Sequence, residues 1–264
     1  KTLPPGRYEN TTIDLTAAPG LGALKVSTLK TQPIDGQKPG TSGLRKKTAV
    51  FTEGKYLHNF VQATFDALKS TGADLECQTL LIGGDGRYYN DTAINVITKI
   101  ALANGVRRVW VAKDGLASTP AVSALIREGG PQWKKVFGAF ILTASHNPGG
   151  PSEDFGIKYN CENGGPAPEK LTNAIYKNTT TITQIKMCEG CPDIDPTVLG
   201  ETVIEARDGS RRVSVEVVDG VAAHVDLLRT VFDLGAIKAL LDRPDFSICF
   251  DAMHGVTGPY AKAL

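Results

Sequence analysis

The chain of 264 residues has no long run of apolar residues and no excess of charge of either sign. A helix that crosses a membrane needs about 18 or more consecutive apolar residues, which no segment of this sequence provides. The formal net charge is +1, so the basic excess that attracts nucleic acids or anionic membranes is missing. We therefore expect no nucleic-acid partner and no integral membrane association.

Paired cysteines and a secretory signal are missing as well. The five cysteines are an odd number in a chain that is large enough to fold without disulfide bonds. Residues 1–18 contain no apolar segment of the kind found in signal peptides. These absences favour a reducing, cytoplasmic compartment.

Apolar strands alternate with amphipathic helices from about residue 24 onward. Strands joined by single helices are typical of an α/β protein, and we predict a mixed, largely parallel sheet with helices on both faces. Asp91 is expected to cap the helix that ends near Ala103. The predicted strands cover 78–82, 108–111, 137–142 and 155–159, and the predicted helices cover 56–69, 91–103, a segment from 118, and 168–177.

Composition divides the chain into three parts. Residues 1–22 contain proline and glycine without periodicity, and we expect a flexible N-terminal extension there. An α/β domain is predicted over 23–210, with a polar, irregular connection over 179–212. A second alternation, including strands at 213–218 and 247–251, predicts part of another α/β domain over 211–264.

Ser145 stands between an apolar strand and a loop rich in glycine and proline. Ligands bind where the strands of a parallel sheet end, and Gly149 and Gly150 let backbone N–H groups approach an anion closely. A serine at such a place can accept and donate a phosphoryl group, and His146 could bond to the phosphate or to a substrate hydroxyl. The same residues also fit a turn in which Ser145 and Asn147 cap backbone groups. No G-x-S-x-G run is present, which disfavours a serine hydrolase.

Six short runs occur in a characteristic order. They are Gly40-Thr41-Ser42-Gly43-Leu44-Arg45, Gly83-Gly84-Asp85-Gly86-Arg87, Thr143-Ala144-Ser145-His146-Asn147-Pro148-Gly149-Gly150, Asp154-Phe155-Gly156-Ile157-Lys158, Asn163-Gly164-Gly165-Pro166-Ala167-Pro168 and Asp251-Ala252-Met253-His254-Gly255-Val256. The set resembles the N-terminal part of the eukaryotic-type phosphoglucomutases, in the α-D-phosphohexomutase superfamily. The resemblance extends from about residue 24 to the end of the chain.

The resemblance implies the first domain of a four-domain phosphohexomutase plus part of the second. It implies an intramolecular phosphotransferase that interconverts glucose 1-phosphate and glucose 6-phosphate through a phosphoserine at Ser145 and glucose 1,6-bisphosphate. It also implies Mg²⁺, bridged between the phosphoserine and three aspartates of a loop that this sequence lacks. Only a phosphate oxygen on Ser145 would ligate the metal here. We therefore expect a native protein roughly twice as long, a monomer, and an inactive fragment.

Further site residues follow from the same resemblance. Arg45 would neutralise phosphate through its planar donor fork, and Lys158 would supply a second cation or a general acid/base. Thr41 and Ser42 would fix the substrate or the phosphoserine loop, and His146 would orient a sugar hydroxyl or the phosphate. Asp85 and Arg87 are expected to form an ion pair that supports the site.

Two other functions stay open at this point. One is a parafusin-like phosphoprotein that acts in calcium-regulated secretion, with peripheral association with vesicles. The other is a phosphomutase for mannose or N-acetylglucosamine phosphates, because the loop that distinguishes sugars is not in this chain.

Several reactive or aromatic residues receive no functional role. Cys188 and Cys191 are expected to be ordinary loop thiols, because no further pair completes a zinc site and no helix start suggests a redox motif. His254 is expected to be structural. Trp110 and Trp133 are expected to pack in the core and at its edge.

Overall fold

The computed structural model describes residues 24–264 except 41, 74, 77, 129–134 and 207–210. The predicted N-terminal extension over 1–22, Thr41 and Trp133 therefore lie outside the described residues. Within the described part, no helix is long and apolar enough to cross a membrane.

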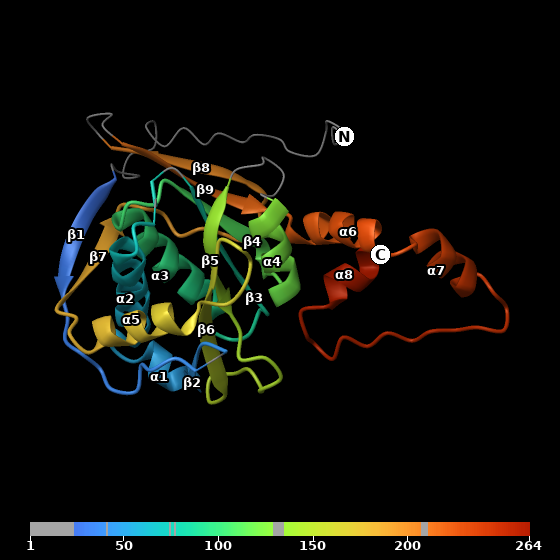
Figure 1. Ribbon diagram of the computed structural model, residues 1–264, viewed down its shortest axis with the longest axis horizontal. Helices are drawn as coiled ribbons and strands as arrows, with labels where there is room; N and C mark the ends of the chain where they lie inside the picture. Colours follow the sequence, from blue (N-terminus) through green and yellow to red (C-terminus); the bar gives the residue numbers. More distant parts are fainter. Residues whose placement is uncertain (1–23, 41, 74, 77, 129–134, 207–210) are drawn as a thin grey trace.

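A seven-stranded sheet forms the centre of the fold, in the order β2-β6-β5-β3-β4-β9-β8 (Figure 1). The four neighbours β5, β3, β4 and β9 are parallel, whereas the pairs β2–β6, β6–β5 and β8–β9 are antiparallel. The predicted mixed α/β sheet is thus confirmed. The strands are β2 (Leu44–Lys47), β3 (Thr79–Gly84), β4 (Arg108–Leu116), β5 (Val136–Leu142), β6 (Asp154–Cys161), β8 (Gly200–Glu205) and β9 (Arg212–Val218).

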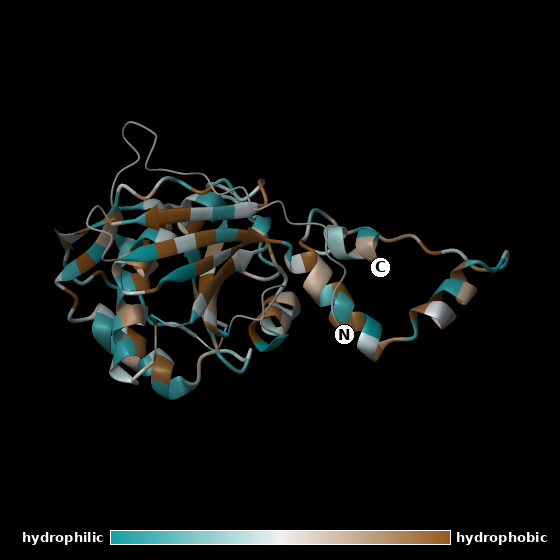
Figure 2. Ribbon diagram, turned by 90° about the horizontal axis from the view of Figure 1, so that it is seen from above, coloured by the Kyte–Doolittle hydropathy of each residue, from teal (hydrophilic) through white to brown (hydrophobic). Residues whose placement is uncertain are grey.

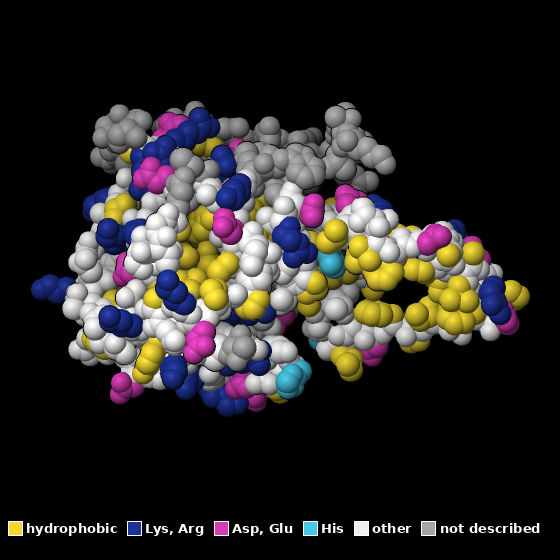
Figure 3. Space-filling model, viewed as in Figure 1, with side chains coloured by type: hydrophobic (Ala, Val, Ile, Leu, Met, Phe, Trp, Pro, Cys, Tyr) yellow, Lys and Arg dark blue, Asp and Glu magenta, His cyan; other side chains and the backbone are white. Residues whose placement is uncertain are grey.

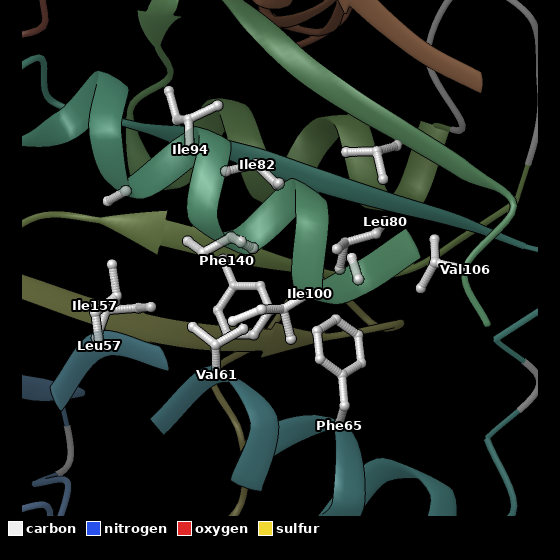
Figure 4. Packing of buried hydrophobic residues seen from close by; sticks show 14 of the residues in the cluster. Leu57, Val61, Phe65, Leu80, Ile82, Ile94, Ile100, Val106, Phe140 and Ile157 are labelled. Atoms are coloured by element: carbon white, nitrogen blue, oxygen red, sulfur yellow. The ribbon is translucent and has the colours of Figure 1, made fainter. Parts of the chain in front are cut away.

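Helices pack on both faces of the sheet, against apolar side chains of the central strands. Leu80 and Ile82 face one side and Leu81 faces the other, because successive side chains of a strand alternate. The first side packs against α2 (Tyr56–Ser70) and α3 (Asn90–Ala103), as Figure 4 shows. The second side packs against α4 (Thr119–Glu128). Two further helices of this body are α1 (Thr48–Thr52) and α5 (Glu169–Thr179).

The polar segment 179–212, of which 207–210 lie outside the described residues, was predicted to be irregular, and this was wrong for 184–189 and 200–205, which form strands. It contains β8 and also β7 (Gln184–Glu189), which pairs antiparallel with β1 (Lys25–Lys30) in a separate two-stranded sheet. β7 shows mixed burial, with Ile185 and Cys188 buried and Gln184 and Glu189 exposed. Such half-buried edge strands carry too few apolar residues to be recognised from sequence.

The last part of the chain consists of helices and extended segments beside the sheet. Helices α6 (Gly220–Val231), α7 (Leu234–Leu241) and α8 (Gly258–Ala263) follow β9. Figures 1 and 2 show that α7 and the segment after it extend away from the sheet. The strand predicted over 247–251 is wrong, because these residues are exposed and pair with no described strand. An apolar run alone does not make a strand without a neighbour to complete its hydrogen bonds.

Two details of the prediction need correction. Asp91 does not cap α3, because the helix begins at Asn90 after Tyr89, which has a left-handed backbone with φ 75°. Asp91 instead lies in the first turn, where a negative charge favours the positive end of the helix dipole. The strand expected to open a second domain after residue 210 is β9, which is hydrogen-bonded to β4 within the main sheet.

Candidate active site

The carboxyl ends of β3 and β5 lie side by side and lead into the two loops that build the site. Gly84 and Leu142 are partners in the parallel register, and the Asp85 N–H donates to the Leu142 carbonyl at 3.1 Å. Gly84 is required for this approach, because a Cβ there would lie 2.3 Å from the Leu142 oxygen. The sheet therefore places the loop after β3 against the loop that carries Ser145.

Ser145 occupies a left-handed backbone conformation, with φ 59°. A residue with a Cβ adopts this conformation only when its surroundings impose it. Here the Ser145 N–H donates to Thr143 Oγ1 at 2.9 Å, and Arg87 Nη2 donates to the Ser145 carbonyl at 3.2 Å. The side chain is exposed, and no other described residue hydrogen-bonds its hydroxyl. The loop thus fixes the backbone of Ser145 and leaves its hydroxyl open for chemistry.

Arg87 and Asp85 form the predicted ion pair beneath this loop. Arg87 Nε and Nη2 lie 2.9 and 2.8 Å from the two Asp85 carboxylate oxygens, and the side chains are 6% and 17% exposed. Asp85 also accepts a hydrogen bond of 2.6 Å from Thr143 Oγ1. Arg87 Nη1 donates to the Asp154 carbonyl at 2.7 Å. One buried guanidinium therefore ties the Ser145 loop to the start of β6, and the predicted ion pair is confirmed.

A pocket of about 810 Å³ opens in front of Ser145 and His146. Both side chains are exposed toward solvent, as a group that receives a ligand must be. The pocket has two opposing walls that come from segments far apart in the sequence. One wall is formed by 85–88, 117–119 and 145–149, and the other is formed by 252–257.

Lys158 lies on β6, the strand next to β5, and Arg45 lies on β2, the strand beyond β6. Arg45 is opposite Gly156 in the β2–β6 register, and Gly156 accepts a hydrogen bond of 2.9 Å from the Thr143 N–H. Lys158 Nζ donates to Thr119 Oγ1 at 3.1 Å, and Thr119 lines the pocket. Burial and then the nearby Arg45 charge lower the pKa of Lys158. The structure therefore brings two cationic side chains to the flank of the Ser145 loop, although neither lines the pocket itself.

Ser42 lies in a tight turn that approaches Lys158. Gly40 and Gly43 exchange backbone hydrogen bonds of 2.9 and 3.1 Å across the turn. Gly43 has φ 92°, and a Cβ there would lie 2.5 Å from Lys158 Cβ. The turn therefore holds exposed Ser42 beside the Lys158 strand. Thr41, the other residue predicted for this loop, lies outside the described residues.

Three contributions to the site were missed from sequence. Met253 and His254 line the pocket with left-handed backbones of φ 47° and 60°, so His254 is exposed at the site rather than purely structural. Tyr260 is buried, and its hydroxyl accepts a hydrogen bond of 3.0 Å from the Ser118 N–H. The resemblance of 251–256 to a family segment was the available signal for His254. Nothing in the sequence pointed to Tyr260.

The described residues do not by themselves make a magnesium site. Among them, no group of three or more His, Cys, Asp or Glu side chains is placed to hold a metal ion. Asp85, the acidic residue of the pocket wall nearest Ser145, already accepts hydrogen bonds from Arg87 and Thr143. A phosphate on Ser145 would offer hard oxygen atoms of the kind Mg²⁺ prefers, but the described residues place no further metal-binding group around it.

Comparisons with known proteins show which family this chain is similar to. The family described as phosphoglucomutase/phosphomannomutase, alpha/beta/alpha domain I, matches residues 36–186. Cytoplasmic phosphoglucomutase from Solanum tuberosum is 57% identical over 242 residues, which are 91% of this chain and 41% of that protein. The corresponding protein from Pisum sativum is 55% identical over 240 residues, 90% of this chain and 40% of that one.

A solved structure is similar in three dimensions. The open form of the exocytosis-sensitive phosphoprotein parafusin, a phosphoglucomutase from Paramecium, gives a TM-score of 0.86 at 42% identity. The match covers 92% of this chain and 43% of the parafusin chain. The chain thus spans about two fifths of the length of the relatives it matches. From its sequence and its fold, the chain belongs to the phosphoglucomutase/phosphomannomutase family and contains the α/β/α domain I of that family.

Proposed function

We propose that this chain is the phosphoserine-bearing part of a cytoplasmic phosphoglucomutase, in which Ser145 carries the phosphoryl group. The main support for this proposal is the position of the Ser145 hydroxyl. The residue follows the carboxyl end of β5, its backbone is held in a left-handed conformation, and its exposed side chain lines a pocket of about 810 Å³. The relatives that support the proposal are named as cytoplasmic phosphoglucomutases. The substrates would be glucose 1-phosphate and glucose 6-phosphate.

The proposed reaction moves a phosphoryl group twice. The bond between Ser145 Oγ and phosphorus breaks as a sugar hydroxyl bonds to that phosphorus, which gives glucose 1,6-bisphosphate. The intermediate then returns its other phosphoryl group to Ser145. Phosphoryl transfer depends on positioning and on neutralisation of charge, which suits a serine whose backbone is fixed on both sides.

The nearby cations have distinct proposed roles. Arg45 supplies a permanent charge beside the Ser145 loop, because a guanidinium does not lose its proton at ordinary pH. Lys158 has a lowered pKa and can hold or release a proton more readily than an exposed lysine. His146 lines the pocket and would orient a sugar hydroxyl or the phosphate. Thr41 and Ser42 would fix the substrate or the phosphoserine loop.

We also propose that Mg²⁺ binds the phosphate on Ser145. When bound there, it would neutralise charge on the phosphate oxygens. Its remaining ligands would come from residues other than those that the structure describes. Glucose 1,6-bisphosphate is proposed as both intermediate and activator, and the enzyme is proposed to act as a monomer.

The domain organisation is also a proposal. The first α/β domain would run from about residue 23 and include β9, because β9 completes the main sheet beside β4. We place the boundary near Asp219, whose side chain caps α6 by accepting from the N–H groups of Val221 and Ala222. The following residues would be part of a second domain.

The direct test uses the native-length protein with Mg²⁺ and a catalytic amount of glucose 1,6-bisphosphate. Formation of glucose 6-phosphate is coupled to its oxidation. Ser145→Ala should reduce turnover on the order of 10³-fold or more, because it removes the hydroxyl that carries the phosphoryl group in the proposed reaction. Ser152→Ala, in the same exposed loop, is the matched control and should leave turnover unchanged. Unchanged turnover in Ser145→Ala would refute the role of Ser145.

A second candidate function rests on the likeness to parafusin. That protein is named as an exocytosis-sensitive phosphoprotein, and its fold matches this chain with a TM-score of 0.86. In such a role the phosphate on Ser145 would act by changing local charge. Vesicle flotation with Ser145→Ala and Ser145→Glu would test it, since a phosphate-dependent association should differ between the two variants. Sugar specificity, including action on mannose or N-acetylglucosamine phosphates, is tested with the same coupled approach on each sugar phosphate.

A further inference from the structure

Two cysteines lie next to each other at the end of β7, far from Ser145 in the sequence. Cys188 is in the strand and Cys191 follows a turn in which Gly190 has φ 79°. Their residues are 1% and 6% exposed, and both belong to the apolar cluster between the sheet and α3. The Cys188 thiol donates to the Glu189 carbonyl at 3.8 Å, and the Cys191 thiol donates to the Pro192 carbonyl at 3.5 Å. Each thiol also shifts the pKa of the other. They are therefore a buried pair at a strand end, not the unrelated loop thiols that the sequence predicted.

We propose that Cys188 and Cys191 form a reversible intrachain disulfide. Residues at the two ends of a tight turn have Cα atoms within about 7 Å, and a disulfide needs Cα atoms about 4.4 to 6.8 Å apart. The turn at Gly190 therefore brings the residues that carry the two sulfur atoms close together. Closing them to a bond of about 2.05 Å needs a small movement, which a glycine in the turn can absorb.

The surroundings give the two thiols different roles. The neighbouring Cys191 thiol lowers the pKa of Cys188, and the positive charges of Arg211 and Lys99 act in the same direction. The neighbouring Cys188 thiol, together with burial, raises the pKa of Cys191. Cys188 is thus the group that forms a thiolate first and attacks an oxidant, and Cys191 is the group that resolves the intermediate.

The oxidant we invoke is a small-molecule disulfide. The Cys188 thiolate attacks one of its sulfur atoms, the S–S bond of the oxidant breaks, and one small thiolate leaves. Cys191 then gives up its proton to the solvent and attacks Cys188 Sγ, which expels the second small thiolate. Two protein thiols are oxidised to one disulfide, and one small disulfide is reduced to two thiols.

The bond would fix the beginning of a segment that reaches toward the active-site pocket. Asp193 pairs with Lys99 at 2.5 Å, and the Ile194 N–H donates to Asn95 Oδ1 at 2.7 Å, so the segment is attached to α3. The Pro196 carbonyl accepts a hydrogen bond of 2.7 Å from the Asp114 N–H, near the end of β4. The chain after β4 leads to the pocket wall at 117–119.

Other cysteines provide internal comparisons. Cys161 is half-buried, and burial raises its pKa; Cys249 is exposed. Neither has a second thiol beside it among the described residues. Reaction of Cys161 or Cys249 with a small disulfide should therefore stop at a mixed disulfide.

The test is differential alkylation of the folded, native-length protein after treatment with oxidised glutathione. Trypsin cuts after Lys186 and Arg207, so one peptide, 187–207, carries Cys188 and Cys191 and no other cysteine. Without reductant this peptide should take up no alkylating reagent and should be lighter by about 2 Da, the mass of two hydrogen atoms lost to the new bond. After reduction it should take up two alkyl groups.

Two variants separate the proposal from general oxidation. Cys191→Ser should convert the product to a glutathione adduct on Cys188, whereas Cys161→Ser should leave the disulfide unchanged. Two alkyl groups on peptide 187–207 of the oxidant-treated folded protein would overturn the proposal. A disulfide that forms only after denaturation, or one that joins Cys188 to another cysteine, would overturn it as well.

Discussion

The burial of apolar side chains differs between two regions of the molecule. These are the sheet-bearing region, residues 24–218, and the C-terminal region, residues 219–264. In the first, Leu80, Ile82 and Phe140 are completely buried between the sheet and its helices. In the second, Ile248 and Phe250 are 69% and 57% exposed, and Figure 3 shows apolar side chains gathered over α7 and the segment after it. The sheet-bearing region therefore holds its side chains by packing, while the C-terminal region depends on few contacts.

The candidate active site lies where these two regions meet. Ser145, His146 and the Arg87–Asp85 pair belong to the sheet-bearing region, whereas the pocket wall at 252–257 belongs to the C-terminal region. The two are joined by packing of α4 against α6 and by the hydrogen bond between Tyr260 and Ser118. We infer that one wall of the pocket is rigid and that the other depends on a few specific contacts.

A pair of Phe→Ala substitutions should show the largest contrast between the regions. Phe140→Ala removes a completely buried ring that packs against Phe65 and Tyr159, and should lower the free energy of unfolding by about 3 to 5 kcal/mol. Phe250→Ala should change it by no more than about 0.5 kcal/mol, because the ring is mostly exposed. Urea denaturation of this 264-residue chain measures both. Equal losses would contradict the comparison.

Asp85→Ala should destabilise the rigid wall by about 3 kcal/mol, because it leaves the buried Arg87 guanidinium without its carboxylate. Asp85→Asn is the matched control, since its amide oxygen can still accept one hydrogen bond and its cost should be smaller. Denaturation and Ser145-dependent turnover are both measured. Loss of stability without loss of turnover would show that the pair does not support the Ser145 loop.

Tyr260→Phe tests the contact that joins the two regions. Removing the hydroxyl leaves the Ser118 N–H without its acceptor, at a cost of about 1 kcal/mol. Because Ser118 lines the pocket, we expect KM for the sugar phosphate to rise several-fold with a smaller change in kcat. Tyr176→Phe, on the exposed part of α5, is the matched control and should change neither value. An unchanged KM in Tyr260→Phe would contradict the proposed role of this contact.

The smallest expected effect is a change in the pH dependence of stability. Burial and then Arg45 lower the pKa of Lys158 below its usual 10.5, so the unfolded chain binds more protons than the folded protein between the two pKa values. Stability from this group should rise with pH toward 10.5 and be lost as pH falls through the lowered pKa. Arg45→Gln should narrow the pH range between the folded and unfolded pKa values of Lys158 over which stability changes. Lys158→Met should abolish this pH dependence. Denaturation at a series of alkaline pH values provides the measurement, and an unchanged slope in Lys158→Met would contradict the assignment.

How much could be predicted from sequence also differs between the regions. The buried strand at 137–142 was predicted because an apolar run suits a strand covered on both faces, and β5 covers Val136–Leu142. The Asp85–Arg87 pair followed from a family motif. The polar edge strands at 184–189 and 200–205 were missed because their burial is partial. In the C-terminal region, the apolar run at 247–251 led to the prediction of a strand. That prediction was wrong because a strand forms only where a partner strand is available.

The position of Ser145 was predictable, but its geometry was not. Its place after a strand and before glycines indicated a ligand-binding loop. The left-handed backbone depends on contacts from Thr143 and Arg87, and the Arg87 contact comes from a loop 58 residues away in sequence. Tyr260 was not predictable for the same reason, because its partner Ser118 lies 142 residues earlier.

The most direct test of the account is to find which residue carries phosphate. The native-length protein is incubated with glucose 1,6-bisphosphate labelled with ³²P, quenched in acid, digested and sequenced by mass spectrometry. The account predicts a single labelled serine, Ser145, whose label is lost when unlabelled glucose 6-phosphate is added before quenching. A label on another residue, or sustained turnover with no label on Ser145, would contradict it.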